Sequence, residues 1–191
     1  MRMYRVNEIF CSLQGEGYHA GTPAAFVRLS GCNLSCPFCD TDHESFRLMT
    51  ADEIVGEARR ASGPAVSMLV LTGGEPTLQA DDELIAALHR GGFYVCMETN
   101  GTHLPPKGVD WLTVSPKSRT AVRQCDELKL VFTDAQHVGD FGIEATHRFL
   151  QPCDTGDPMR NSDIVSRCVD YVRQHPQWRL SLQVHKLAGF K

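Results

Sequence analysis

Short apolar runs alternate with amphipathic stretches along most of the chain. The apolar runs that predict strands cover residues 4–10, 23–30, 66–71, 93–97, 111–114, 128–132, 147–150 and 179–184. Residues 66–71 are almost continuously apolar, which is typical of a strand buried on both faces of a parallel sheet. Helical periodicity predicts helices over about 50–61, 80–90 and 162–174. Strands that alternate with helices indicate right-handed βαβ units and a parallel sheet.

The chain has 191 residues, fewer than the roughly 250 of a complete (β/α)8 barrel. We therefore predict a single domain, residues 1–191, that folds as an α/β protein: an incomplete parallel (β/α) barrel of about six βα units. Glycine-rich or polar segments follow directly after several predicted strands, at 32–39, 72–76, 98–101, 115–117 and 151–152. Because the carboxyl ends of parallel strands meet on one face, we expect these segments to surround one active-site mouth.

Three cysteines, Cys32, Cys36 and Cys39, form a C-x3-C-x2-C pattern on the first of these segments. Three thiolates on a short loop suit a soft metal or an iron-sulfur cluster, and they leave one metal position open for a ligand that is not protein. A zinc site with a distant fourth ligand and a C-x2-C redox pair are the alternatives. Neither alternative gives a reason for the alignment of the other segments at the same mouth.

The composition and charge of the chain exclude several classes of function and location. The net charge of -4 argues against a general polyanion-binding surface, so we expect no direct binding to nucleic acid. The apolar runs are shorter than a membrane span, and residues 1–5 lack the apolar core of a secretion signal, so a cytoplasmic protein without membrane contact is expected. In that compartment the cysteines outside the pattern are predicted to be small, buried, reduced residues: Cys11, Cys96, Cys125, Cys153 and Cys168.

The cysteine pattern, with the aromatic Phe38 just before its third cysteine, resembles the signature of the radical S-adenosylmethionine (SAM) enzymes. The resemblance implies a [4Fe-4S] cluster on Cys32, Cys36 and Cys39, whose open iron chelates SAM, and cleavage of SAM to methionine and a 5'-deoxyadenosyl radical. Gly73-Gly74-Glu75-Pro76 resembles the motif that holds the methionine amino group of SAM. The implied SAM contacts are Phe38, Cys39, Asp40, Gly74, Glu75, Ser115, Pro116, Lys117, Gln151 and Pro152.

Within that superfamily, nearly the whole chain is similar to the 7-carboxy-7-deazaguanine synthase family. The segments that carry this similarity are 12–17, Arg28, 39–41, 72–76, 115–117, 151–152 and 181–186. The resemblance implies conversion of 6-carboxy-5,6,7,8-tetrahydropterin to 7-carboxy-7-deazaguanine and ammonia, with SAM regenerated, in the biosynthesis of queuosine and other 7-deazapurines. The family is usually homodimeric, and radical SAM chemistry requires an external one-electron reductant of the flavodoxin or ferredoxin type.

The resemblance also implies a substrate site and a magnesium ion. The planar donor fork of Arg28 suits the substrate carboxylate, and the hydroxyl of Thr41 is a hard oxygen ligand for Mg²⁺. The last five residues, 187–191, have no secure match to the family, in which the terminal carboxylate can reach the substrate. The residues expected to contact the substrate are Leu13, Gln14, Gly15, Arg28, Thr72, His185 and Lys191.

Two other functions remain open at this point. A glycyl-radical-activating enzyme shares the cysteine loop and the SAM motifs but acts on a protein glycine. The segment 12–17 and Arg28 instead favour a small anionic heterocycle as the substrate. A non-enzymatic iron-sulfur module for electron transfer would need a fourth cluster ligand and would leave Gly73-Gly74-Glu75-Pro76 unexplained.

Overall fold

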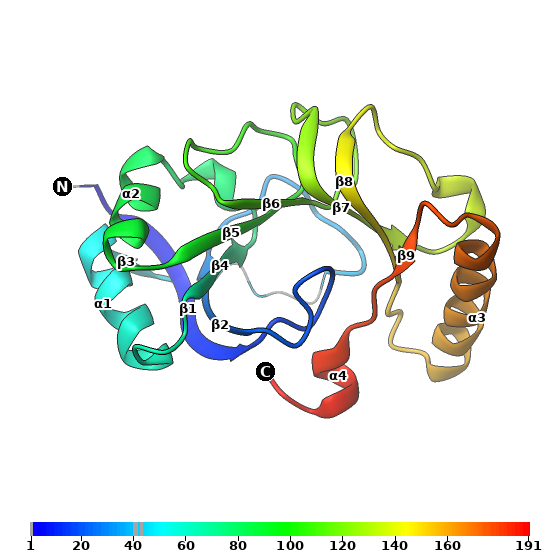
Figure 1. Cartoon of the computed structure of the whole chain (residues 1–191), viewed down its shortest axis with the longest axis horizontal. Helices are drawn as coiled ribbons and strands as arrows, with labels where there is room; N and C mark the ends of the chain where they lie inside the picture. Colours follow the sequence, from blue (N-terminus) through cyan, green and yellow to red (C-terminus); the bar gives the residue numbers. More distant parts are fainter. Residues whose placement is uncertain (1, 40–41, 43) are drawn as a thin grey trace.

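The fold is built on one curved sheet. The computed structural model describes residues 2–39, 42 and 44–191, and in this part of the chain the sheet has nine strands in the order β3-β1-β2-β4-β5-β6-β7-β8-β9 (Figure 1). β1 is antiparallel to its neighbours β2 and β3, and every pair from β2 to β9 is parallel. The strands are β1 (Tyr4–Leu13), β2 (Pro23–Leu29), β3 (Arg47–Met49), β4 (Met68–Gly73), β5 (Tyr94–Thr99), β6 (Trp111–Val114), β7 (Gln124–Phe132), β8 (Glu144–Pro152) and β9 (Arg179–Leu180).

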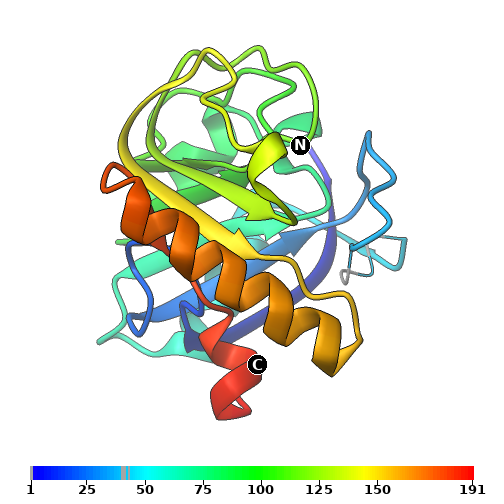
Figure 2. The ribbon, with the colours of Figure 1, turned by 90° about the vertical axis from the view of Figure 1, so that its right-hand side faces the viewer.

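Helices lie against the outer, convex side of this sheet (Figures 1 and 2). α1 (Ala51–Ser62) and α2 (Asp82–Arg90) pack near one end, and α3 (Pro158–Gln174) packs against β8 and β9. Short 3-10 helices, η1 (Pro76–Leu78) and η2 (Ala135–His137), lie in connections, and α4 (Val184–Ala188) follows β9. Of the six parallel connections between β2 and β9, those through α1, α2 and α3 carry an α-helix in the described residues.

This arrangement confirms the predicted α/β class and the incomplete barrel, because the sheet is mostly parallel and does not close. The capping box at the start of α1 is also confirmed: Thr50 accepts from the amide of Glu53, and the Glu53 carboxylate accepts from the amide of Thr50. The connections from β5 to β6 and from β6 to β7 are irregular, so the βα alternation is less regular than the sequence predicts.

Three predictions need correction. The strand expected over 179–184 ends at Leu180, because beyond Ser181 the chain leaves β8 for the β1–β2 hairpin, where the amide of Val184 donates to the carbonyl of Gly15 at 2.9 Å. The following residues form α4 instead of extending the strand. Cys11 is exposed rather than buried, whereas the other four cysteines outside the pattern are buried as expected. Helix α3 also begins earlier than expected, at Pro158, where Asp157 caps the amides of the first turn.

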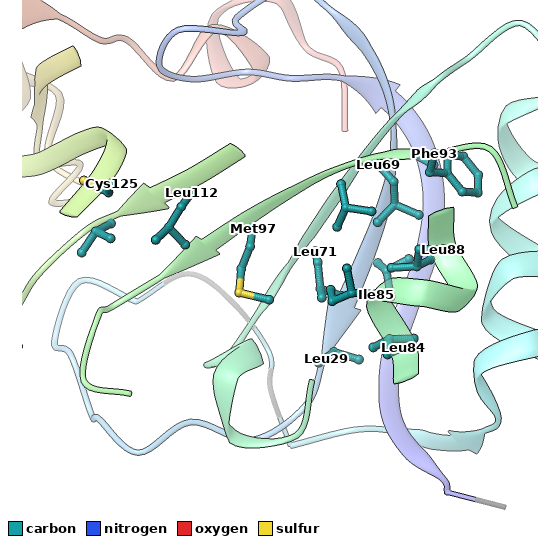
Figure 3. Close-up of a cluster of buried hydrophobic side chains, with 14 of the residues drawn as sticks. Leu29, Leu69, Leu71, Leu84, Ile85, Leu88, Phe93, Met97, Leu112 and Cys125 are labelled. Carbon is teal, nitrogen blue, oxygen red and sulfur yellow. The ribbon is translucent and has the colours of Figure 1, made fainter. Parts of the chain in front are cut away.

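The main core lies between the sheet and its helices. Leu84, Ile85 and Leu88 of α2 pack onto side chains of β2, β4 and β5 (Figure 3). The labelled sheet residues near α2 are Leu29, Leu69 and Leu71, with Phe93 beside them, and Met97, Leu112 and Cys125 continue the same core along β5, β6 and β7. Removal of this apolar surface from water is the main contribution to stability, at roughly 25 cal/mol per Å² buried.

The opposite, inner face of the sheet has a smaller apolar cluster at its amino end. It consists of Ala24, Phe26, Met68, Val70 and Cys96, with Phe10 and Trp111 packed against them. Residues 68–71 alternate between the two clusters, which is why this run is continuously apolar in the sequence. Towards the carboxyl ends of the strands the inner face becomes polar, and the functional segments lie there. No helix among the described residues is both long and apolar enough to span a bilayer.

Gly73, at the carboxyl end of β4, gives the first testable prediction. A Cβ at this position would lie 2.2 Å from the carbonyl oxygen of Leu29, and φ is +118°, so alanine is opposed by both sterics and backbone conformation. We expect Gly73→Ala to lower the free energy of unfolding by about 2 kcal/mol or more. Denaturant unfolding followed by circular dichroism measures the effect.

Gly56→Ala is the matched control, because this glycine lies inside α1 and a Cβ there would meet only a guanidinium nitrogen of Arg60 at 3.4 Å. This control is expected to raise the free energy of unfolding by about 0.5 to 1 kcal/mol. Equal unfolding midpoints for Gly73→Ala and the wild type would contradict the close packing at β2.

Candidate active site

A cavity of about 530 Å³ opens at the carboxyl ends of the parallel strands. This volume is within the usual range for small-molecule sites. Most of the residues predicted from the sequence line it: Leu13, Gln14, Gly15, Arg28, Cys32, Cys36, Phe38, Cys39, Thr72, Gly74, Ser115, Lys117, Gln151, His185 and Lys191. Glu75, Pro116 and Pro152 are not among the lining residues, and Asp40 and Thr41 lie outside the described residues.

The three cysteines of the pattern all line this one cavity. The amide of Cys39 donates to the carbonyl of Cys36 at 3.1 Å, which forms a tight turn between them. Burial raises the pKa of the Cys36 thiol, and the nearby charge of Lys117 opposes that rise. In the described ranges no three His, Cys, Asp or Glu side chains converge as they would on a single metal ion. Ligands of a four-iron cluster bind different irons, so a set of three thiols on one cavity wall fits such a cluster.

The Gly-Gly-Glu-Pro segment after β4 is joined to the base of the cysteine loop. The amide of Gly74 donates to the carbonyl of Leu29 at 2.9 Å, and the amide of Glu75 donates to the carbonyl of Gly31 at 2.8 Å. Cys32 follows directly. These bonds therefore fix where the cysteine loop leaves the sheet relative to the segment expected to hold SAM.

The side chain of Glu75 makes its hydrogen bonds to other protein groups and not to the cavity. Its side chain is fully buried, and its carboxylate accepts from the hydroxyls of Thr77 and Thr99 at 2.6 Å and from the amide of Asn100 at 2.7 Å. Asn100 in turn donates to the side chain of Asn33 in the cysteine loop at 3.0 Å. The Glu75 carboxylate thus joins the loops after β4 and β5, and its side chain lies behind the cavity wall.

Lys117 and Ser115 form the polar pair after β6. The Nζ of Lys117 donates to the carbonyl oxygen of Ser115 at 2.9 Å and lies 5.9 Å from the ring centroid of Phe38. Burial lowers the pKa of Lys117 to about 8, with the charge of Lys129 acting in the same direction. The amine is therefore only partly protonated in mildly alkaline solution.

The β1–β2 hairpin supplies the opposite wall. Nε of Arg28 lies 3.4 Å from a carboxylate oxygen of Glu8, and its guanidinium lies 5.4 Å from the ring centroid of Phe10. Lys191 also pairs with Glu8, and its backbone oxygen accepts from the hydroxyl of Ser12 at 2.5 Å. Glu8 therefore holds two cationic side chains at this side of the cavity.

His185 of α4 closes the cavity beside Gly15. The amide of Val184 donates to the carbonyl of Gly15 at 2.9 Å, which attaches α4 to the hairpin loop. A Cβ at Gly15 would lie only 2.3 Å from Nδ1 of His185. A glycine is therefore required at position 15 for the imidazole to reach this place.

Charged residues at the floor of the cavity were not predicted as site residues from the sequence. Glu16 and Glu98 line the cavity, and the buried Lys129 lies within 2.6 Å of a carboxylate oxygen of Glu16 and 3.6 Å of one of Glu98. Gln183 also lines the cavity and donates to Glu16 at 3.1 Å. The sequence feature that could have indicated this cluster is the lysine at position 129, between Leu128 and Leu130 in the apolar run of β7.

Comparisons with known proteins show which family the chain belongs to. Residues 26–122 match the model of the radical SAM superfamily. A 7-carboxy-7-deazaguanine synthase from Bacteroides thetaiotaomicron is 51% identical over 192 residues, which cover 99% of this chain and all of that protein. One from Caulobacter vibrioides is 43% identical and covers 97% of this chain and 98% of that protein. The chain belongs to the 7-carboxy-7-deazaguanine synthase family.

A solved structure agrees with this assignment to the synthase family. The crystal structure of QueE from Escherichia coli is 28% identical, has a TM-score of 0.75, and matches 96% of this chain and 95% of that one. Membership of the radical SAM superfamily implies a [4Fe-4S] cluster and SAM as cofactors. In this member of the synthase family the three cysteines and the two glycines of the Gly-Gly-Glu-Pro segment line the same cavity.

The contact between Gly15 and His185 predicts how a substitution would act on this synthase-family pocket. Gly15→Ala is expected to displace His185 and to loosen α4, because the new methyl group and the imidazole cannot occupy the same space. Amide hydrogen exchange of residues 184–188 should become roughly tenfold faster. Gly139→Ala is the control, since a Cβ there would meet no atom within 4 Å. Unchanged exchange in Gly15→Ala would contradict the predicted displacement.

Proposed function

We propose that this chain is a radical SAM enzyme that converts 6-carboxy-5,6,7,8-tetrahydropterin to 7-carboxy-7-deazaguanine and ammonia, with SAM regenerated. The observation that carries the proposal is the 51% identity, over the full length of both proteins, to a relative of that name. The reaction places the product in the biosynthesis of queuosine and other 7-deazapurines. The cavity volume of about 530 Å³ suits SAM and a small heterocycle bound together.

The cofactor end of the cavity is proposed to lie at the cysteine loop. Cys32, Cys36 and Cys39 would hold the cluster, and the bound cluster and SAM together supply a primary carbon radical. Such a radical attacks whatever lies nearest, so the chain's own contribution is to fix positions and exclude water. We assign SAM binding to Phe38, Cys39, Asp40, Gly74, Glu75, Ser115, Pro116, Lys117, Gln151 and Pro152. The direct contacts come from those that line the cavity, and Glu75 acts by bracing the loops.

The substrate end is proposed to lie between the β1–β2 hairpin and α4. The guanidinium of Arg28 would bind the substrate carboxylate through paired hydrogen bonds. The side-chain nitrogen of Gln14 donates to Glu98 at 2.9 Å, and its side-chain oxygen accepts from the amide of Glu16 at 3.2 Å, so Gln14 would offer its second side-chain N–H to the edge of the ring. The proposed substrate contacts are Leu13, Gln14, Gly15, Arg28, Thr72, His185 and Lys191, which all line the cavity.

A magnesium ion is proposed to assist the reaction, with the hydroxyl of Thr41 as a ligand. The support is the family resemblance of the segment 39–41 and the hard oxygen donor that a threonine offers. Mg²⁺ would stabilise negative charge on the substrate carboxylate during rearrangement. Thr41 and the neighbouring Asp40 lie outside the described residues.

Further expectations follow from the family. We propose that the chain is one domain over residues 1–191, that it forms a homodimer in the cytoplasm, and that an external flavodoxin- or ferredoxin-type protein supplies the electron. The partly exposed cysteine loop supports an external donor, because Cys39 and Phe38 are accessible at the protein surface.

Anaerobic turnover tests the proposal directly. Protein with a reconstituted cluster is incubated with a strong reductant, SAM, Mg²⁺ and 6-carboxytetrahydropterin, and the products are identified by mass. We expect 7-carboxy-7-deazaguanine to form without stoichiometric loss of SAM, and to form more slowly when magnesium is chelated. If SAM is cleaved to deoxyadenosine and no deazaguanine appears, the substrate assignment is wrong. If SAM is also left intact, the assignment to radical chemistry is wrong.

Arg28→Lys tests the carboxylate contact. Lysine keeps the positive charge but cannot form the planar pair of hydrogen bonds, so KM for the pterin should rise roughly tenfold with a smaller change in kcat. Arg173→Lys, on the exposed face of α3, is the matched control and should leave both constants unchanged. A KM equal to that of the wild type would contradict the assignment of Arg28 as a ligand of the substrate carboxylate.

A further inference from the structure

Lys129 lies behind the floor of the cavity rather than in it. This β7 side chain is only 6% exposed, and its Nζ donates to Oε2 of Glu16 at 2.6 Å and lies 3.6 Å from Oε1 of Glu98. Both glutamates line the cavity, whereas Lys129 is outside the set of lining residues. A buried ammonium group therefore joins two cavity carboxylates from behind. One belongs to the β1–β2 hairpin loop and the other to β5, two elements whose places in the fold are seen in Figure 1.

Each of these carboxylates has a second contact that fixes its orientation. Gln14 donates to Oε1 of Glu98 at 2.9 Å, and Gln183 donates to Oε1 of Glu16 at 3.1 Å. The lysine and the two glutamines thus bind carboxylate oxygens from three sides. Gln151 makes a further hydrogen bond to Glu16. Because both glutamates line the cavity, lone pairs that these contacts leave unused would suit a heterocycle that offers N–H donors.

The charges around this group explain why the lysine is needed. Burial by itself raises the pKa of Glu16, but the charge and hydrogen bond of Lys129 outweigh it and bring the pKa to about 2. Burial also raises the pKa of Glu127, which faces Lys129 from the same strand. The titratable groups that face Glu16 are Glu98, Lys117, Glu127 and Lys129. Without Lys129, three carboxylates would share this region with Lys117.

We propose that Lys129 is a positioning residue for the substrate pocket: it holds the carboxylates of Glu16 and Glu98 in place as paired hydrogen-bond acceptors, without touching the substrate itself. The inference rests on the proposed function, because that function supplies the heterocycle. Buried ion pairs contribute little net stability compared with apolar residues of the same volume. The use of the two carboxylates in the cavity accounts for the cluster better than stability does.

Three variants test this role in the cluster-loaded protein. Lys129→Met keeps the aliphatic stem and removes the charge, and Lys129→Arg keeps the charge. The double variant Lys129→Met with Glu127→Gln removes one carboxylate that does not line the main cavity, which protects folding if the single variant is unstable. Lys107→Met, at an exposed position after α2, is the control for loss of a lysine.

The first measurement is stability against pH, which does not depend on the substrate. In the wild type, the depressed pKa of Glu16 stabilises the fold above its usual value near 4.5, and this contribution is lost as the pH falls towards 2. In Lys129→Met, burial should raise that pKa above its usual value. The deficit in thermal midpoint relative to wild type should therefore be large at pH 8 and shrink towards pH 5.

The second measurement is KM for the pterin against pH. For Lys129→Met we expect KM at least tenfold above wild type at pH 7.5, and the ratio of the two KM values should grow as the pH falls from 8.5 to 6, because protonated Glu16 is a poorer acceptor. The change in kcat should be smaller, and Lys129→Arg should recover most of the KM. Protonation of the free substrate changes both KM values by the same factor, so it does not affect their ratio.

The outcomes separate this inference from the proposed function. A KM ratio that does not change with pH, or a loss confined to kcat, would overturn the positioning role even if stability is reduced. If the deficit in thermal midpoint is the same at pH 8 and pH 5, the inference that Lys129 keeps Glu16 ionised is wrong. If the wild type does not turn over the pterin while the stability arm behaves as expected, the proposed function fails and the pairing of Lys129 with Glu16 stands.

Discussion

The loops around the cavity depend on one close contact between main chains. Gly73 at the end of β4 packs against Leu29 at the end of β2 so tightly that a side chain at position 73 would overlap the Leu29 backbone. The next two amides then reach the carbonyls of Leu29 and Gly31, and the cysteine loop starts from there. A loop that must present three thiols in a fixed pattern is thus attached directly to two neighbouring strands of the parallel sheet.

The second constraint is how the interior of the partial barrel is divided. The outer face of the sheet packs a large apolar core under the helices, whereas the inner face has a smaller apolar cluster towards the amino ends of the strands. At the carboxyl ends the inner residues are charged or polar, and they satisfy one another: Glu75 with the loops after β4 and β5, and Lys129 with two glutamates. Polar groups buried in this way hold their positions without a ligand, so the cavity is organised before anything binds.

Much of this could be predicted from the sequence because its signals are local. Apolar runs mark the strands, Thr50 and Glu53 mark the start of α1, and the functional segments are found where strands end. The exceptions have tertiary causes. The run at 179–184 is apolar enough for a strand, but beyond Ser181 the chain leaves the sheet, and the amide of Val184 donates to Gly15 in the distant β1–β2 hairpin. Cys11 lies near the end of an edge hairpin, where an apolar residue is exposed because no helix covers it.

The role of Lys129 could not be predicted for a different reason. In β7 the residues Leu128, Leu130 and Phe132 face the outer core, so Glu127 and Lys129 occupy the alternate positions of an ordinary two-residue period. Read as a pattern, that alternation is typical of a strand with one face in water. In a curved sheet the alternate face points into the barrel, where the partner of Lys129 is a glutamate 113 positions earlier in the chain. A sequence pattern cannot distinguish a face turned to solvent from a face turned to a ligand, because both require polar side chains at the same period.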